Sequence, residues 1–132
     1  MHVVPSLAPA PVHLPALIVS RPGSPGREVA LRERTTVVGR DPHLAVCLND
    51  VAVSRCHAAF VVQGSRTWVS DLGARNGVWI NGFRIDVASP VRLRPGDRLR
   101  IGNTELEYRA PLVGSGALET LLAASQRARR VT

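Results

Sequence analysis

Apolar and polar residues alternate in short runs along most of the chain from Ala16 onward. Residues 98–101 alternate strictly, which is typical of a strand that buries one face. Turn-forming pairs such as Asn76-Gly77 separate the runs. The predicted strands are Ala16–Ser20, Arg27–Leu31, Arg34–Arg40, Ala45–Leu48, His57–Gln63, Arg66–Asp71, Gly77–Ile80, Phe83–Asp86, Pro90–Leu93, Asp97–Ile101 and Thr104–Tyr108. Short strands without a long helical period predict an all-β fold, an eleven-stranded β-sandwich whose strand order the pattern leaves open.

The two ends of the chain differ in composition from this strand-rich part. Residues 1–14 are rich in Pro and Ala and predict a flexible extension, whereas residues 15–111 hold every predicted strand and fit one domain. Residues 112–132 contain a Gly-Ser-Gly linker, after which Ala117–Arg130 follows a helical period with arginines near its end. This amphipathic basic tail is either a frayed end or a short helix that docks or mediates weak self-association.

The chain is strongly basic, with a formal charge of +7 at pH 7, and all 17 basic residues are arginine. Guanidinium groups bind phosphate in a bidentate manner, so the composition favours an anionic partner, either nucleic acid or a phosphoprotein. The apolar stretches are far shorter than the roughly 20 residues that span a bilayer. The N-terminus is interrupted by prolines and does not fit a signal peptide. We therefore expect no membrane association and a cytoplasmic location.

Two cysteines, Cys47 and Cys56, are too few for a disulfide framework, and we expect both to be reduced. A zinc site that combines them with His43 and His57 is disfavoured. Cys56 and His57 are adjacent at the start of a predicted strand, so their side chains would point to opposite faces. We expect neither a metal nor another cofactor.

Polar residues gather in three segments at strand ends, where loops can bring side chains to one ligand. The segments are Val-Gly-Arg-Asp-Pro at 38–42, Val-Ser-Arg-Cys-His at 53–57 and a twelve-residue stretch at 71–82; a Pro-Gly-Asp turn follows at 95–97. In this order they resemble the forkhead-associated (FHA) domain family, whose pattern is GR, SRxH, (D/N)LxSxNGxxxNG and PGD. The resemblance covers about residues 15–110.

The resemblance implies a sandwich whose loops at one end bind a phosphothreonine peptide from a substrate of a Ser/Thr kinase. Carried over by position, Arg40 contacts the phosphate, Ser54 donates its hydroxyl to it, and Asn76 hydrogen-bonds the peptide main chain. Arg55 and Arg75 occupy variable loop positions next to the peptide. The expected function is that of a phosphothreonine-binding adaptor.

The resemblance also implies residues that support the binding loops. These are Gly39, His57, Gly77, Asn81 and Gly82. The glycines would allow unusual backbone angles, and His57 would brace the loops by hydrogen bonding. One position departs from the pattern, because Ala74 stands where the family commonly has serine, and this weakens the case for a well-ordered loop.

The residue types support the same function without the family. A phosphate dianion needs several preorganised donors, which Arg40, Ser54 and the backbone amides of the Ser54-Arg55 turn can supply. Charge-assisted hydrogen bonds contribute about 1.5–3 kcal/mol each. We expect micromolar binding, around −8 kcal/mol, and weak binding of Asp or Glu in place of the phosphothreonine.

Three other functions compete with this one. Ser54, His57 and Asp71 could form a hydrolytic triad, but the sequence has no GxSxG elbow and no Walker-type loop, so no enzyme is expected. The positive charge suits nucleic acid, but the arginines are spread over many strands and most aromatic residues are predicted to be core. The aromatic residues are Phe60, Trp68, Trp79, Phe83 and Tyr108. The third alternative is a scaffold that binds partners without phosphate.

Overall fold

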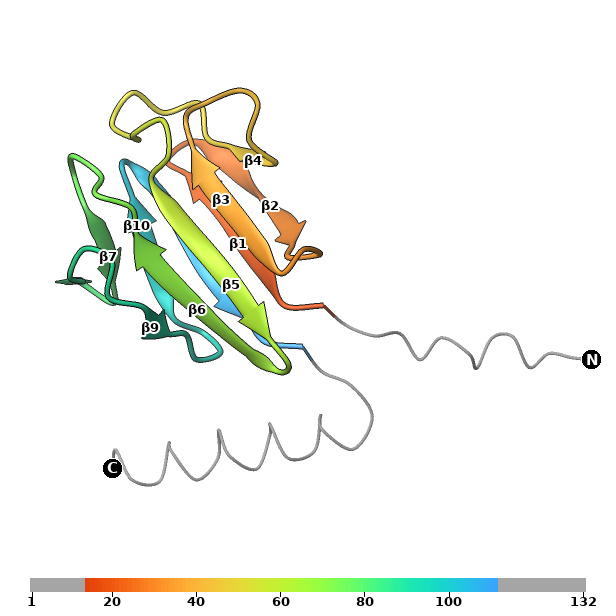
Figure 1. Cartoon of the computed structure of the whole chain (residues 1–132). Helices are drawn as coiled ribbons and strands as arrows, with labels where there is room; N and C mark the ends of the chain where they lie inside the picture. Colours follow the sequence, from red (N-terminus) through yellow and green to blue (C-terminus); the bar gives the residue numbers. More distant parts are fainter. Residues whose placement is uncertain (1–13, 112–132) are drawn as a thin grey trace, which may run out of the picture. The chain divides into compact units, whose positions relative to one another are not determined.

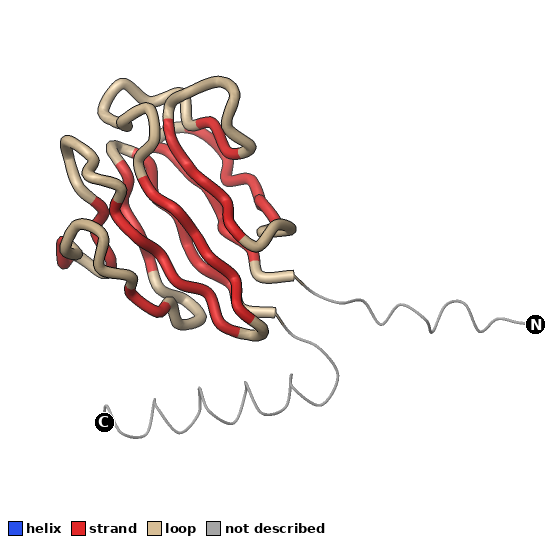
Figure 2. Tube along the Cα trace, viewed as in Figure 1, coloured by secondary structure: helices blue, strands red, loops and turns tan. Residues whose placement is uncertain are grey.

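The computed structural model describes residues 14–111, which form eleven strands in two sheets and contain no helix (Figure 1) (Figure 2). The strands are β1 (Ala16–Arg21), β2 (Ser24–Ala30), β3 (Thr35–Gly39), β4 (Val46–Cys47), β5 (Ala58–Gln63), β6 (Arg66–Asp71), β7 (Val78–Ile80), β8 (Phe83–Arg84), β9 (Val91–Arg92), β10 (Arg98–Ile101) and β11 (Thr104–Arg109). The predicted all-β, eleven-stranded sandwich is confirmed. The predicted extension and basic tail lie outside the described residues, apart from Leu14.

The two sheets are built from strands that are distant in sequence. One has six strands in the order β2-β1-β11-β10-β7-β8, and the other has five in the order β4-β3-β5-β6-β9. Neighbouring strands in both sheets pair antiparallel, except for the parallel pair β3–β4. β1 pairs with β11 from Ala16 opposite Arg109 to Ser20 opposite Glu105, so the first and last strands are neighbours.

Alternating side chains of both sheets form the core. Leu17 and Leu106 from the six-stranded sheet and Phe60 and Val69 from the five-stranded sheet have no exposed surface. This follows from the period of two, which sends successive side chains to opposite faces of a strand. Tyr108 is also buried, and its hydroxyl donates a hydrogen bond to Thr67 Oγ1 across the sandwich at 2.7 Å. Burial raises the pKa of the Tyr108 phenol above its ordinary value of 10.0.

Two details differ from the sequence predictions. The connection between the first two predicted strands, residues 21–26, is shorter in the structure, because Ser24 already pairs with Arg21 and only Pro22 and Gly23 lie between them. Gly23 completes this turn with a φ of 80°. The prediction that most aromatic residues lie in the core is wrong: Phe60 and Tyr108 are buried, Trp68 and Trp79 are half-buried, and Phe83 is 78 % exposed.

The loops at one end of the sandwich carry most of the sequence motifs. The β3–β4 loop, the long β4–β5 loop and the β6–β7 loop lie at the upper end in Figure 1. The β10–β11 turn lies at the same end. Among residues 14–111, no helix is long and apolar enough to cross a membrane.

Candidate functional site

Three loops enclose one small cleft at this end of the fold. Its volume is about 170 Å³. It is lined by Arg40, Val51, Ala52, Val53, Ser54, Arg55, Arg75 and Asn76. All five residues that the sequence assigns to ligand binding therefore lie around a single cleft, although up to 36 positions separate them along the chain. The lining contains three arginines and no carboxylate, so the cleft is positively charged and suited to an anion.

Arg40 is fixed at the end of β3 by two hydrogen bonds to the β4–β5 loop. Its backbone N–H donates to the Ser54 carbonyl at 2.9 Å, and its Nε donates to the Val53 carbonyl at 2.9 Å. The side chain is otherwise exposed. The two Nη groups, which form the outer part of the guanidinium fork, are left for a ligand.

Ser54 is oriented from both its backbone and its side chain. The Oγ atom accepts a hydrogen bond from the Arg75 backbone N–H at 3.1 Å, which joins the β4–β5 loop to the β6–β7 loop. Since the hydroxyl acts there as an acceptor, its own hydrogen is available to donate. A half-buried hydroxyl that is held by one bond and free to donate another fits an anionic oxygen.

Asn76 is similarly engaged on one side only. Its side-chain Nδ2 donates to the Ala52 carbonyl at 2.8 Å, and its backbone carbonyl accepts a hydrogen bond from Trp79 Nε1 at 3.0 Å. The Oδ1 atom and one N–H of the amide have no partner among the described residues. An amide with one acceptor and one donor left matches the main chain of an extended peptide.

His57 lies underneath the cleft with no exposed surface. Its Nδ1 accepts the Ser54 backbone N–H at 3.0 Å, so the ring proton resides on Nε2, which donates to the Gly77 carbonyl at 2.7 Å. One neutral ring thus connects the loop that carries Ser54 to the loop that carries Asn76.

The supporting glycines act in two different ways. Gly77 and Gly82 have φ of 74° and 87°, in the left-handed region that glycine adopts without strain. Gly39 has no such angle, and the prediction of an unusual backbone angle is wrong for this residue. A Cβ on Gly39 would overlap the Arg55 carbonyl oxygen, so glycine is needed here for the close approach of β3 to the β4–β5 loop.

Asn81 lies away from the cleft and fixes the β7–β8 turn. Its Oδ1 accepts the Arg98 backbone N–H at 3.0 Å, and its Nδ2 donates to Asp97 Oδ1 at 3.0 Å. Asn81 itself has a φ of 50°, which asparagine tolerates better than most residues. It supports the sheet beside the cleft and does not line the cleft.

Arg55 is the one cleft arginine with an ionic partner among the described residues. Its Nη2 lies 3.6 Å from Asp41 Oδ2 at an exposed position. The backbone hydrogen bond from His43 holds the pKa of Asp41 below its ordinary value of 3.8, with further contributions from the His43 ring and from Arg55. Arg40 and Arg75 have no carboxylate within salt-bridge distance in residues 14–111, so their charge is directed to the cleft.

Asp50 is a structural residue that the sequence analysis missed. The side chain is 2 % exposed and accepts hydrogen bonds from the Ala52 N–H at 2.9 Å, the Asn103 N–H at 2.8 Å and the Thr104 hydroxyl at 2.8 Å. Burial alone would raise the pKa of Asp50, but these hydrogen bonds outweigh it and hold the pKa below 3.8. Asp50 thereby attaches the β4–β5 loop to the β10–β11 turn.

The hydrogen bonds of the candidate triad residues are directed elsewhere. Both ring nitrogens of His57 bind backbone groups, and neither contacts the Ser54 hydroxyl. Asp71 uses Oδ1 to accept the backbone amides of Gly73 and Ala74, each at 2.9 Å. In the described part of the chain no three His, Cys, Asp or Glu side chains gather in a group that could hold a metal.

A β-sandwich with an arginine-lined cleft between its end loops defines a class of ligand-binding domain. The chain belongs to the FHA domain family, whose model matches residues 36–102. Among curated relatives, it is 37 % identical over 92 residues to the glycogen accumulation regulator GarA of Mycolicibacterium smegmatis, covering 70 % of this chain and 56 % of GarA. It is 38 % identical over 92 residues to the oxoglutarate dehydrogenase inhibitor of Corynebacterium jeikeium, covering 70 % of this chain and 62 % of that protein. The match thus spans little more than half the length of these relatives.

Solved structures agree with this assignment. One comes from a structural and functional study of phosphothreonine-dependent FHA domain interactions, with a TM-score of 0.63 and 28 % identity over 71 % of this chain and 95 % of that chain. Another is EmbR of Mycobacterium tuberculosis in complex with a low-affinity phosphopeptide. It has a TM-score of 0.65 and 31 % identity over 76 % of this chain and 25 % of EmbR.

Proposed function

We propose that this protein is a non-catalytic adaptor that binds phosphothreonine-containing proteins in cytoplasmic Ser/Thr kinase signalling. The observation that carries the proposal is the unused hydrogen-bonding capacity of three residues. After their bonds within the protein, Arg40 keeps its Nη groups, Ser54 keeps its hydroxyl hydrogen, and Asn76 keeps an acceptor and a donor. The donors of Arg40 and Ser54 suit phosphate oxygens, and the side-chain amide of Asn76 suits the peptide bond next to the phosphothreonine.

The relatives support this assignment. The structures of EmbR with a phosphopeptide and of phosphothreonine-dependent FHA interactions concern the same fold. Two relatives are named a regulator and an inhibitor, which suits a protein that acts by binding. Arg40 and Ser54 bind the phosphate, Asn76 binds the peptide main chain, and Arg55 and Arg75 flank the peptide. His57 and the glycines hold the loops in place.

The cleft also accounts for the expected strength of binding. Two or three charge-assisted hydrogen bonds contribute about 1.5–3 kcal/mol each and offset the desolvation of a phosphate dianion. Because the loops are already hydrogen-bonded to one another, little ordering is needed on binding. A dissociation constant in the micromolar range, about −8 kcal/mol, follows.

The test is titration of the full chain with a degenerate phosphothreonine peptide library, beside matched phosphoserine and unphosphorylated libraries. We expect binding to phosphothreonine peptides alone. Arg40→Ala and Ser54→Ala should each weaken binding at least tenfold while the melting temperature stays within about 2 °C, because both side chains are at least partly exposed. Arg66→Ala, in an exposed position of β6, is the matched control for loss of one charge.

Other results would support other functions. Equal binding to all three libraries that disappears at high salt would indicate unspecific attraction of polyanions. Binding that ignores the phosphate would indicate a phosphate-independent scaffold. Wild-type affinity of Arg40→Ala would show that the phosphate does not bind in this cleft.

A further inference from the structure

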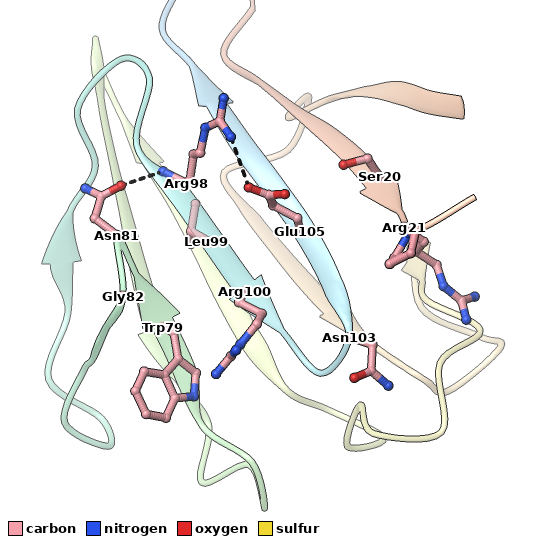
Figure 3. A pocket seen from close by; sticks show the side chains of 11 residues that line it. Ser20, Arg21, Trp79, Asn81, Gly82, Arg98, Leu99, Arg100, Asn103 and Glu105 are labelled. Atoms are coloured by element: carbon pink, nitrogen blue, oxygen red, sulfur yellow. Dashed lines mark hydrogen bonds and ion pairs between the residues drawn. The ribbon is translucent and has the colours of Figure 1, made fainter. Parts of the chain in front are cut away.

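A second, larger hollow lies on the outer face of the six-stranded sheet (Figure 3). Its volume is about 730 Å³, and four neighbouring strands, β7, β10, β11 and β1, contribute to its floor and walls. It is lined by Ser20, Arg21, Pro22, Trp79, Asn81, Gly82, Arg98, Leu99, Arg100, Asn103 and Glu105. The lining contains three arginines and a single carboxylate, so the hollow is positively charged.

An intermediate hollow of about 510 Å³ connects this surface to the cleft described above. It shares Ala52, Arg75 and Asn76 with the cleft, and it shares Trp79, Arg100 and Asn103 with the outer hollow. We call the intermediate and outer hollows together the basic groove. The groove begins beside Asn76, and the shared lining residues place its two parts next to each other on the sheet.

The arginines where the groove begins are free to bind an anion. Arg75, Arg84 and Arg100 line the intermediate hollow, which contains no carboxylate. In residues 14–111 none of the three lies within 4.0 Å of an acidic group. Three cations close together repel one another in the absence of a ligand, so an anionic ligand would stabilise this surface.

The groove also has a rigid flat side that can orient a ligand. The Arg100 guanidinium lies over the Trp79 ring, 5.0 Å from its centroid (Figure 3). The Trp79 ring is held in place by its Nε1, which donates to the Asn76 backbone carbonyl. A guanidinium fixed on an aromatic face loses little freedom when it binds a carboxylate.

We propose that the basic groove binds an acidic segment of the phosphorylated partner, outside the phosphothreonine itself. The proposal rests on the proposed function, because the phosphothreonine would anchor the partner at the beginning of the groove. The four strands have three spacings of about 4.8 Å between them, so the groove runs about 14 Å across the strands. At roughly 3.3 Å per extended residue, this length accommodates about four residues. The positive charge of the lining fits Asp and Glu side chains.

The experiment compares three phosphopeptides on the full chain at about 0.15 M salt. One contains only the phosphothreonine core, the second adds four glutamates after a short linker on the N-terminal side, and the third adds them on the C-terminal side. We expect one of the two extensions, and not the other, to strengthen binding about fivefold, the gain of one or two exposed ion pairs. Equal gains from both extensions, or no gain from either, would overturn the proposal.

Variants localise the effect. Arg100→Gln should remove most of the gain from the productive extension and leave the affinity for the core peptide unchanged. Arg66→Gln removes the same charge from the other sheet and should leave the gain intact. A similar loss in both variants would indicate long-range attraction by net charge and would contradict a defined groove.

A measurement that does not need phosphate keeps the groove separate from the proposed function. The two tryptophan indole N–H groups give separate NMR signals, and Trp68 lies on the other sheet with its Nε1 buried. A tetraglutamate peptide without phosphate, at millimolar concentration, should shift the Trp79 signal and leave that of Trp68 in place. An unmoved Trp79 signal would overturn the groove even if phosphopeptides bind, and failure of the core phosphopeptide alone would refute only the proposed function.

Discussion

Replacing His57 with leucine tests whether one buried ring holds the binding loops together. Leucine has a similar size but no hydrogen-bonding group, so the Ser54 N–H and the Gly77 carbonyl would both lose their partner. An unpaired buried polar group costs about 1–3 kcal/mol, which gives about 4 kcal/mol for the two. The apolar side chain offsets about 1 kcal/mol of this. We expect the free energy of unfolding to fall by about 3 kcal/mol and the melting temperature by about 12–24 °C.

The assay is urea denaturation followed by tryptophan fluorescence, with thermal unfolding as a second measurement. His43→Leu is a matched control, because the His43 side chain is 93 % exposed and its replacement should change stability by less than about 0.5 kcal/mol. At a temperature where His57→Leu is still folded, phosphopeptide affinity should also fall, since the loops that carry Ser54 and Asn76 are no longer connected through the ring. A His57→Leu protein as stable as the control would refute the reasoning.

Three further predictions concern the supports of the loops. The pKa of Asp50 is lowered in the folded protein, so its contribution to stability is present above about pH 4 and disappears as the pH falls below that. Asp50→Asn should therefore lower stability at pH 7 by about 1–3 kcal/mol and flatten the acid limb of the stability curve, measured by urea denaturation from about pH 3 to 7. Gly39→Ala should destabilise the fold by about 1–3 kcal/mol and weaken phosphopeptide binding at least tenfold in a titration, because the methyl group overlaps the Arg55 carbonyl; unchanged affinity would contradict this. Ala74→Ser should raise stability by about 1 kcal/mol in thermal unfolding, because the buried Asp71 Oδ2 has no partner among the described residues and a hydroxyl at 74 can donate to it; a lower melting temperature would contradict this.

The strands could be predicted because most of them bury one face only. Buried positions alternate with more exposed ones along β10 and β11. Apolar and polar residues therefore alternate in their sequences with the period of two that predicts a strand. β2 carries less of this signal, because its first five residues are all exposed at the edge of the sheet. With Pro25 and Gly26 in that stretch, the composition indicated a turn where the chain is already paired.

The order of the strands could not be predicted, and residues whose role depends on it were missed. Asp50 binds Asn103 and Thr104, which are 53 and 54 positions away. Nothing near Asp50 in the sequence indicates these partners, because the β10–β11 turn comes close to the loop only through the topology of the two sheets. The position of Trp79 depends on the topology as well, since an aromatic residue in a short apolar run is usually buried. Its neighbour Arg100 on β10 instead places it on the outer face.

The polar residues that line the cleft were predicted from the sequence, but the structural role of each comes from its hydrogen bonds. Arg40 uses one side-chain donor in a hydrogen bond within the protein, whereas His57 uses both ring nitrogens in such bonds. Loss of Arg40 should therefore reduce affinity and leave stability intact, and loss of His57 should reduce both. The side chain of Arg100 stacks on Trp79, so its loss should affect neither stability nor binding of the core phosphopeptide. Each variant gives a different pair of results. Measuring stability together with phosphopeptide affinity therefore separates a residue that binds the phosphate from a residue that supports the loops and from a residue of the basic groove.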